Sequence, residues 1–199
     1  MHNIFDATRL RGISLQNRVF RSATWMGMAG EGGSVTGAVI DLYRACAHGG
    51  VGGIITGFTS VSPHDGELPR AMRLDSDACV AGHQHLTAAV HEMGSRVFVQ
   101  MAMLDTHSTY GAGRGVPKTV NEMTLRDIQG MVALYRDAAV RAKRAGYDGA
   151  QIHAAHFFAL SKCISPLMPV RLRPKKNSPK NPVLCYKDFA QHFNTCLSG

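Results

Sequence analysis

Short apolar runs that alternate with helix-like stretches constrain this chain more than any other feature of its sequence. Four runs are rich in Val and Ile: NRVFRSAT at 17–24, VGGIITGF at 51–58, SRVFVQM at 95–101 and GAQIHA at 149–154. Their apolar residues are consecutive rather than alternating, which is typical of strands buried on both faces of a parallel sheet. We therefore predict four parallel strands.

Apolar residues at helical spacing fill the three intervals between these runs. The three stripes are Val39, Leu42, Tyr43 and Cys46; Cys79, Leu86, Val90 and Met93; and Ile128, Met131, Val132, Tyr135, Ala138, Ala139 and Ala142. Thr124 and Asp127 fit a capping pair at the start of the third helix, and Gly146 fits its C-terminal cap. The predicted order is βαβαβαβ, with right-handed crossovers.

This alternation is shared by doubly wound sheets and by barrels, and the strand ends separate the two. A dinucleotide-binding sheet has G-x-G-x-x-G after its first strand, whereas this chain reads RSATWMGMAGEGG there. Polar side chains instead follow the strands: Ser22 and Thr24, Thr56, Gln100, and His153 with His156. Such groups at the C-terminal ends of several strands are typical of the (β/α)₈ barrel. We expect an α/β fold of the TIM-barrel type, limited to about its first four βα units.

Four segments, in this order and spacing, resemble the old yellow enzyme family of FMN-dependent NAD(P)H oxidoreductases. They are LQNRVFRSAT, GGVGGIITGFTSVSP, RVFVQM, and GYDGAQIHAAH followed by SP. The resemblance covers residues 4–166, and RSAT is similar to the bacterial NADH:flavin oxidoreductase branch. It implies FMN as cofactor, NAD(P)H as reductant and a small-molecule electrophile as substrate.

The resemblance also implies which residues contact the flavin. Ser22, Ala23 and Thr24 match the strand end that packs against the flavin ring, partly through backbone groups; an ordinary βα loop is the alternative. Gly57 and Phe58 match the second strand end. Phe58 is larger than the family's usual Ala or Gly, so only a backbone contact is carried over.

Gln100 matches the amide that pairs with the pyrimidine edge of the flavin, because a primary amide offers donors and an acceptor together. A Gln bonded to neighbouring backbone is the alternative.

His153 and His156 match the family's histidine pair, which binds the substrate carbonyl oxygen and polarises the conjugated alkene. His153 is also implied as a flavin contact. A structural pair or a metal site are alternatives. Because His-x-x-His supplies two ligands and no Cys or acid lies at ligand spacing, we expect no metal.

Two departures from the family pattern follow the histidines. Phe157 and Phe158 stand where the family usually has Gly and then Tyr, and a phenyl ring has no proton to donate as a general acid. From Leu167 onward, the chain lacks the family's further βα units. We therefore expect a partial FMN-binding barrel at 1–166 and a basic, Pro- and Lys-rich tail at 167–199, with a short helix possible only at 183–193.

The charge of the chain is concentrated in this tail. The six basic residues Arg171, Arg173, Lys175, Lys176, Lys180 and Lys187 and the single acid Asp188 supply +5 of the net charge of +8. No aromatic interleaving accompanies them, so a nucleic-acid partner is not expected.

The sequence shows no sign of a membrane or secreted protein. No apolar run approaches the roughly 18–20 residues that span a membrane, and MHNIFDATRLRG is no secretory signal. The five scattered cysteines fit free thiols. We expect a cytoplasmic protein.

The function expected from the resemblance is reduction of activated alkenes, such as α,β-unsaturated carbonyls, or similar electrophiles. The alternative is a catalytically inactive fragment that binds a partner. An open set of four strands leaves its first and last strands unpaired. Association with a second copy or with a homologue is therefore also expected.

Overall fold

A computed structural model describes residues 3–63, 65, 68–104 and 123–164. The predicted tail at 167–199 and the short helix at 183–193 lie outside these residues. Of the predicted site, Ser22, Ala23, Thr24, Phe58, Gln100, His153 and His156 are all described.

The centre of the molecule is a parallel sheet with strand order β3-β4-β6-β7. The strands are β3 (Phe20–Arg21), β4 (Gly53–Ser60), β6 (Arg96–Ala102) and β7 (Gly149–Ile152), and a short fifth strand, β5 (Met72–Arg73), also pairs with β4. The four predicted strands are thus confirmed in order and direction. Their sequential pairing is the arrangement of neighbouring strands in a (β/α) barrel.

The first strand is much shorter than the run predicted at 17–24. Asn17 forms a turn before it, because its Oδ1 accepts from Val19 N at 3.0 Å and its Nδ2 donates to Gly50 O at 2.6 Å. After Arg21 the chain leaves the ladder with β4. The apolar run therefore includes a turn and the start of a loop as well as the strand.

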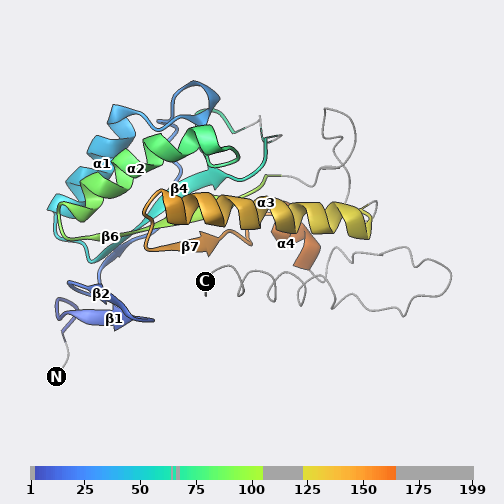
Figure 1. Cartoon of the computed structure of the whole chain (residues 1–199). Coiled ribbons are helices and arrows are strands. Elements are labelled where there is room, and N and C mark those ends of the chain that lie inside the picture. Colours follow the sequence, from blue (N-terminus) through green and yellow to red (C-terminus); the bar gives the residue numbers. More distant parts are fainter. Residues whose placement is uncertain (1–2, 64, 66–67, 105–122, 165–199) are drawn as a thin grey trace.

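Three helices pack side by side on one face of the sheet (Figure 1). They are α1 (Gly37–His48), α2 (Val80–His91) and α3 (Leu125–Arg144). The predicted cap of α3 is confirmed as a capping box, in which Thr124 Oγ1 accepts from Asp127 N and the Asp127 carboxylate accepts from Thr124 N. Cys79 and Met93, expected in the second helix, flank α2 instead.

Several short elements were not predicted. An antiparallel hairpin, β1 (Thr8–Leu10) and β2 (Ile13–Leu15), precedes the sheet and lies apart from the helices (Figure 1). Its turn places Arg11 and Gly12 at φ of 42° and 89°, a conformation that glycine adopts without strain. Two 3₁₀ turns, η1 (Glu31–Gly33) and η2 (Asp77–Cys79), and the short helix α4 (Ala159–Ile164) complete the described elements.

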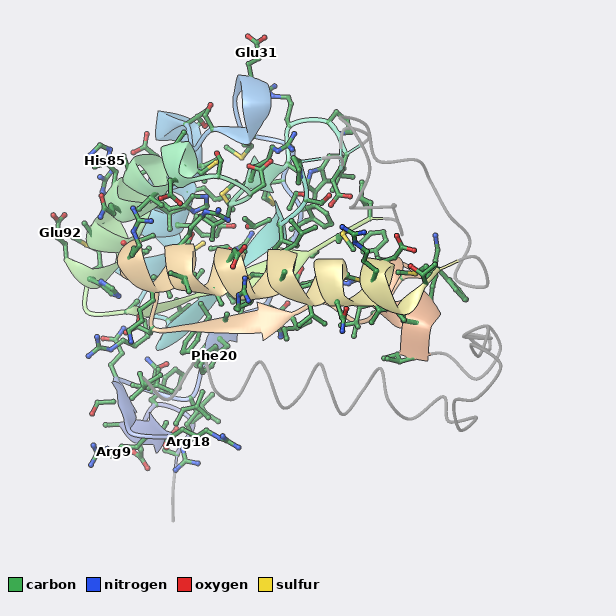
Figure 2. All side chains as sticks on the ribbon, turned by 45° about the vertical axis from the view of Figure 1, so that its right-hand side comes forward. Arg9, Arg18, Phe20, Glu31, His85 and Glu92 are labelled. Atoms are coloured by element: carbon green, nitrogen blue, oxygen red, sulfur yellow. The ribbon has the colours of Figure 1, made fainter. Side chains whose placement is uncertain are left out.

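The apolar core lies between the sheet and the three helices. Strand residues Ile54, Val97, Val99 and Met101 pack there against helix residues that include Tyr43, Leu86, Met131 and Tyr135, all nearly or fully buried. Phe20 lies close to the sheet and the hairpin, whereas Glu31, His85 and Glu92 project outward (Figure 2). The predicted apolar stripes of the helices thus pack against the sheet in one core.

Among the described helices, none has the length and apolar character needed to cross a bilayer. Cys46 and Cys79 carry free thiols, and Cys185 and Cys196 lie outside the described part of the chain.

Candidate functional site

The end of β4 and the segment that follows β3 are in close contact. A Cβ added at Gly57 would lie 2.3 Å from the Thr24 carbonyl oxygen, so only glycine allows this approach. Gly57 N also donates to Tyr43 Oη at 2.8 Å, which ties the strand end to α1. The first and second strand ends are therefore held together by backbone contact.

The segment that follows β3 and leads into this contact consists of Ser22, Ala23 and Thr24. Ser22 and Thr24 are exposed and Ala23 is half-buried. The Ser22 carbonyl accepts from Thr24 Oγ1 at 3.4 Å and from Arg21 Nη1 at 3.3 Å. The three residues present mainly backbone and small side chains at the C-terminal edge of the sheet.

Phe58 occupies the end of β4, after an irregularity in its pairing with β6. The register shifts between Ile55 and Phe58, and Phe58 then pairs with Gln100. Its side chain is buried with Ala71 and Ala102 and meets the Phe158 ring edge-on, at 5.7 Å between centroids. The Phe58 ring therefore belongs to a small apolar cluster beneath the strand ends.

Gln100 lies on the sheet face opposite the helices and is half-buried. Its Nε2 donates to Oε1 of Gln151, its direct neighbour on β7, at 2.8 Å. Its backbone N–H donates to Thr56 Oγ1 at 3.2 Å. The Gln100 side chain thus has a side-chain partner rather than the neighbouring backbone.

His153 and His156 form a hydrogen-bonded pair just beyond β7. His153 Nδ1 accepts from Ala155 N at 3.4 Å, so the proton of neutral His153 is on Nε2. That Nε2–H donates to His156 Nδ1 at 2.9 Å. Neutral His156 then carries its proton on Nε2, which makes this N–H the donor that remains for a ligand.

Burial keeps His153 neutral. Its side chain is 8% exposed. Desolvation and the nearby His156 lower the pKa of His153 below its ordinary value, because both disfavour the imidazolium. The lowered pKa therefore favours the neutral form of His153, whose Nε2–H faces His156 Nδ1.

The two phenylalanines after the pair have different environments. The Phe158 ring lies 4.8 Å from His153 and 5.8 Å from His156, measured between centroids. Phe157 is 61% exposed and has a φ of 56°, directly after His156 at 57°. Phe158 therefore supports the imidazoles, whereas Phe157 stands in a left-handed conformation that favours glycine.

Contacts connect several of the predicted residues along the C-terminal ends of the sheet strands. Thr24 contacts Gly57, Phe58 pairs with Gln100, and Phe58 meets the Phe158 ring that supports the histidines. Tyr43 and Gln151 also contact these residues but were not among the predicted site residues. The sequence could have indicated Gln151, because it precedes His153 by two residues and strand residues two apart share a face.

Metal ligation has no basis within the described residues. Nowhere in that part of the chain do three or more His, Cys, Asp or Glu side chains gather as metal ligands. The histidine pair bonds internally instead.

Comparison with known proteins identifies relatives of this chain. The family model of the NADH:flavin oxidoreductase / NADH oxidase family matches residues 3–181, a range that extends past residue 166. An NADH oxidase of Thermoanaerobacter brockii is 33% identical over an alignment of 178 residues that covers 82% of this chain and 27% of the relative. An NADPH dehydrogenase of Halalkalibacterium halodurans is 26% identical over an alignment that covers all of this chain and 61% of the relative.

A solved structure shows the same fold. The old yellow enzyme homologue of Zymomonas mobilis superposes with a TM-score of 0.79 at 22% identity, over 98% of this chain and 61% of its own. The chain thus spans 27% and 61% of the curated relatives' lengths. Its parallel strands β3, β4, β6 and β7 fit part of a TIM barrel of this type. Because the family model matches most of its residues, the chain belongs to the NADH:flavin oxidoreductase / NADH oxidase family.

Proposed function

We propose that this chain provides the flavin-ring and substrate side of an FMN-dependent NAD(P)H oxidoreductase that reduces activated alkenes or similar electrophiles. The observation that carries the proposal is the placement of Gln100 and the His153–His156 pair on one face of adjacent strand ends. In a barrel of this type such a face would point inward, and active sites lie at the C-terminal ends of its strands. FMN, when bound, supplies hydride transfer between the nicotinamide and the electrophile.

The residues present fit a flavin ring. Gln100 retains one N–H and its carbonyl oxygen beyond the bond to Gln151, a set that complements the neighbouring C=O and N–H groups of a pyrimidine edge. At Gly57 the missing side chain lets the backbone of Thr24 and Trp25 approach the strand end. Ser22, Ala23, Thr24 and the Phe58 backbone would then contact the ring.

The histidine pair supports binding of a carbonyl oxygen. His156 Nε2–H is the free donor, and the bond from His153 orients the His156 ring. A positioned N–H stabilises negative charge that develops on a carbonyl oxygen during reduction of the conjugated alkene. Because His153 is buried, the pair holds its orientation before the ligand arrives.

A reconstitution experiment tests this proposal. The full chain is titrated with FMN, and NADH or NADPH oxidation is then followed with an enone acceptor. We expect a yellow protein whose turnover requires the enone and is lost in His156→Ala, while that variant retains most of its flavin affinity. Protein that stays colourless at high FMN concentration would overturn the proposal.

A second candidate is a catalytically inactive protein that binds a partner. It is favoured by Phe158, which cannot protonate a substrate carbon as the family's Tyr does, and by the exposed apolar side chains around the open sheet face, such as Phe20 and Phe157. FMN binding without enone turnover, together with stable association with a homologous full-length barrel, would support this candidate over the first.

A further inference from the structure

The contact between Gln100 and Gln151 gives a role to a residue outside the predicted site. Gln151 lies directly opposite Gln100 in the register of β6 and β7, and its Oε1 accepts from Gln100 Nε2 at 2.8 Å. We infer that Gln151 is a positioning residue that holds the Gln100 amide ready for the pyrimidine edge of a flavin. The inference rests on the proposed function.

The need for such a residue follows from the freedom of a glutamine side chain. Gln100 has several rotatable bonds, and its terminal amide can turn to exchange oxygen and NH₂. Ordering such a side chain costs conformational entropy, and a group ordered before binding does not lose that entropy when the ligand arrives. Gln100 is half-buried on the open face, where Gln151 is its side-chain partner.

The hydrogen-bond inventory shows why an acceptor at 151 selects one orientation. The Gln100 amide has two N–H donors and one oxygen, and Gln151 Oε1 takes one N–H. The second N–H and the oxygen then remain for the ligand. With Gln151 in its present orientation, a turned-over Gln100 amide would place its oxygen against Gln151 Oε1, which is an unfavourable contact between two acceptors.

A competing role predicts the opposite effect. If Gln151 only occupied the donor that a flavin needs, its removal would free Gln100 and tighten FMN binding. The positioning role requires that its removal weakens binding. It also requires that this effect disappears once Gln100 is gone.

A double-mutant cycle decides between them. FMN dissociation constants of the full chain are measured by quenching of flavin fluorescence for the parent, Gln100→Leu, Gln151→Leu and the double variant. We expect Gln151→Leu to weaken binding by about three- to tenfold in the parent and by less than about twofold in the Gln100→Leu background. Equal effects in both backgrounds, no effect, or tighter binding would overturn the positioning role.

Two further variants separate positioning from a general disturbance. Gln151→Glu keeps an acceptor and offers no competing donor, so it should restore FMN affinity to within about twofold of the parent. Gln129→Leu, an exposed glutamine on α3, is the matched control and should leave affinity unchanged. A Gln151→Glu variant as weak as Gln151→Leu would contradict the role.

A flavin-free measurement keeps this inference distinct from the proposed function. In the NMR spectrum of the apoprotein, Gln151→Leu should shift the Gln100 side-chain NH₂ signals toward those of a freely rotating amide, and Gln151→Glu should not. If the parent binds no FMN, the proposed function fails, but the NMR measurement still tests whether Gln151 orients Gln100. Unchanged Gln100 signals in Gln151→Leu would overturn the positioning role even if FMN binds.

Discussion

The two faces of the central sheet are built largely from alternate residues of the same strands, yet they differ in what lies against them. Under α1, α2 and α3, residues Ile54, Val97 and Val99 are fully buried in one apolar core. On the opposite face, Ile55 is half-buried and Gln151 is exposed. Because neighbouring strand residues point to opposite faces, one residue step separates a position that stabilises the fold from one that can contact a ligand.

The open face is itself divided along the strands. Near the strand beginnings, the Phe20 ring covers Gly53 and the Phe98 ring lies beside Gly149, with 5.9 Å between the two ring centroids. Toward the strand ends, the two glutamines and the histidine pair lie beside the apolar cluster of Phe58. Barrel enzymes generally place their active sites at these C-terminal ends.

The sharpest test of this comparison uses two adjacent isoleucines on β4. Ile54→Ala should lower the free energy of unfolding by about 2–5 kcal/mol, because it leaves a cavity in the helix-covered core. Ile55→Ala, on the open face, should cost about 1 kcal/mol, since less apolar surface is lost from a half-buried position. Urea unfolding followed by circular dichroism measures both. Equal losses would show that another molecule covers the open face in solution.

The covered side should also dominate the acid sensitivity of the protein. His83 on α2 is buried between Tyr147 Oη (2.7 Å) and the Arg73 carbonyl (2.9 Å), and burial lowers its pKa from 6.5 to about 4. The unfolded chain binds this proton near pH 6.5 and the folded chain only near pH 4. Stability is therefore full above pH 6.5 and decreases toward pH 4, by about 3 kcal/mol in total.

Unfolding free energies measured between pH 7 and 4 check this expectation. His83→Gln should flatten the pH dependence. The matched control is His85→Gln, on the exposed side of the same helix (Figure 2), which should leave the pH dependence in place. The assignment to His83 fails if both variants keep the parent's slope.

On the open face, substitution should change binding rather than stability. Gln100→Leu should weaken FMN binding by about 1–3 kcal/mol, because the flavin edge then faces a position without a hydrogen-bond partner. Its unfolding free energy should stay near that of the parent. Val99→Ala, one residue earlier on the covered face, should show the reverse pattern. Unchanged flavin affinity in Gln100→Leu would remove Gln100 from the site.

The smallest expected effect concerns backbone strain beside the histidines. A left-handed conformation costs a residue other than glycine about 1–2 kcal/mol, and glycine offsets part of this through its flexible unfolded state. Phe157→Gly should therefore raise the free energy of unfolding by about 0.5–1 kcal/mol. Phe157→Ala removes the same ring but keeps Cβ, so it should bring no gain; an equal gain in both variants would assign the effect to the exposed ring.

Much of the fold follows from local patterns in the sequence. The α3 cap was predictable because the side chains of Thr124 and Asp127 accept hydrogen bonds from each other's backbone N–H within one helical turn. The core stripes were readable because helix periodicity does not depend on distant partners. The β1–β2 hairpin and β5 were missed, since strands of two or three residues carry too little pattern to distinguish them from loops.

The sequence by itself determined the order of strands and helices, the family, and the residue types at the strand ends. Only the tertiary structure decided how those residues are connected. The bond between Gln100 and Gln151 joins positions 51 residues apart, and the proton order of the His153–His156 pair depends on the Ala155 backbone. Hydrogen-bond partners across strands depend on register and backbone direction, which no local pattern encodes.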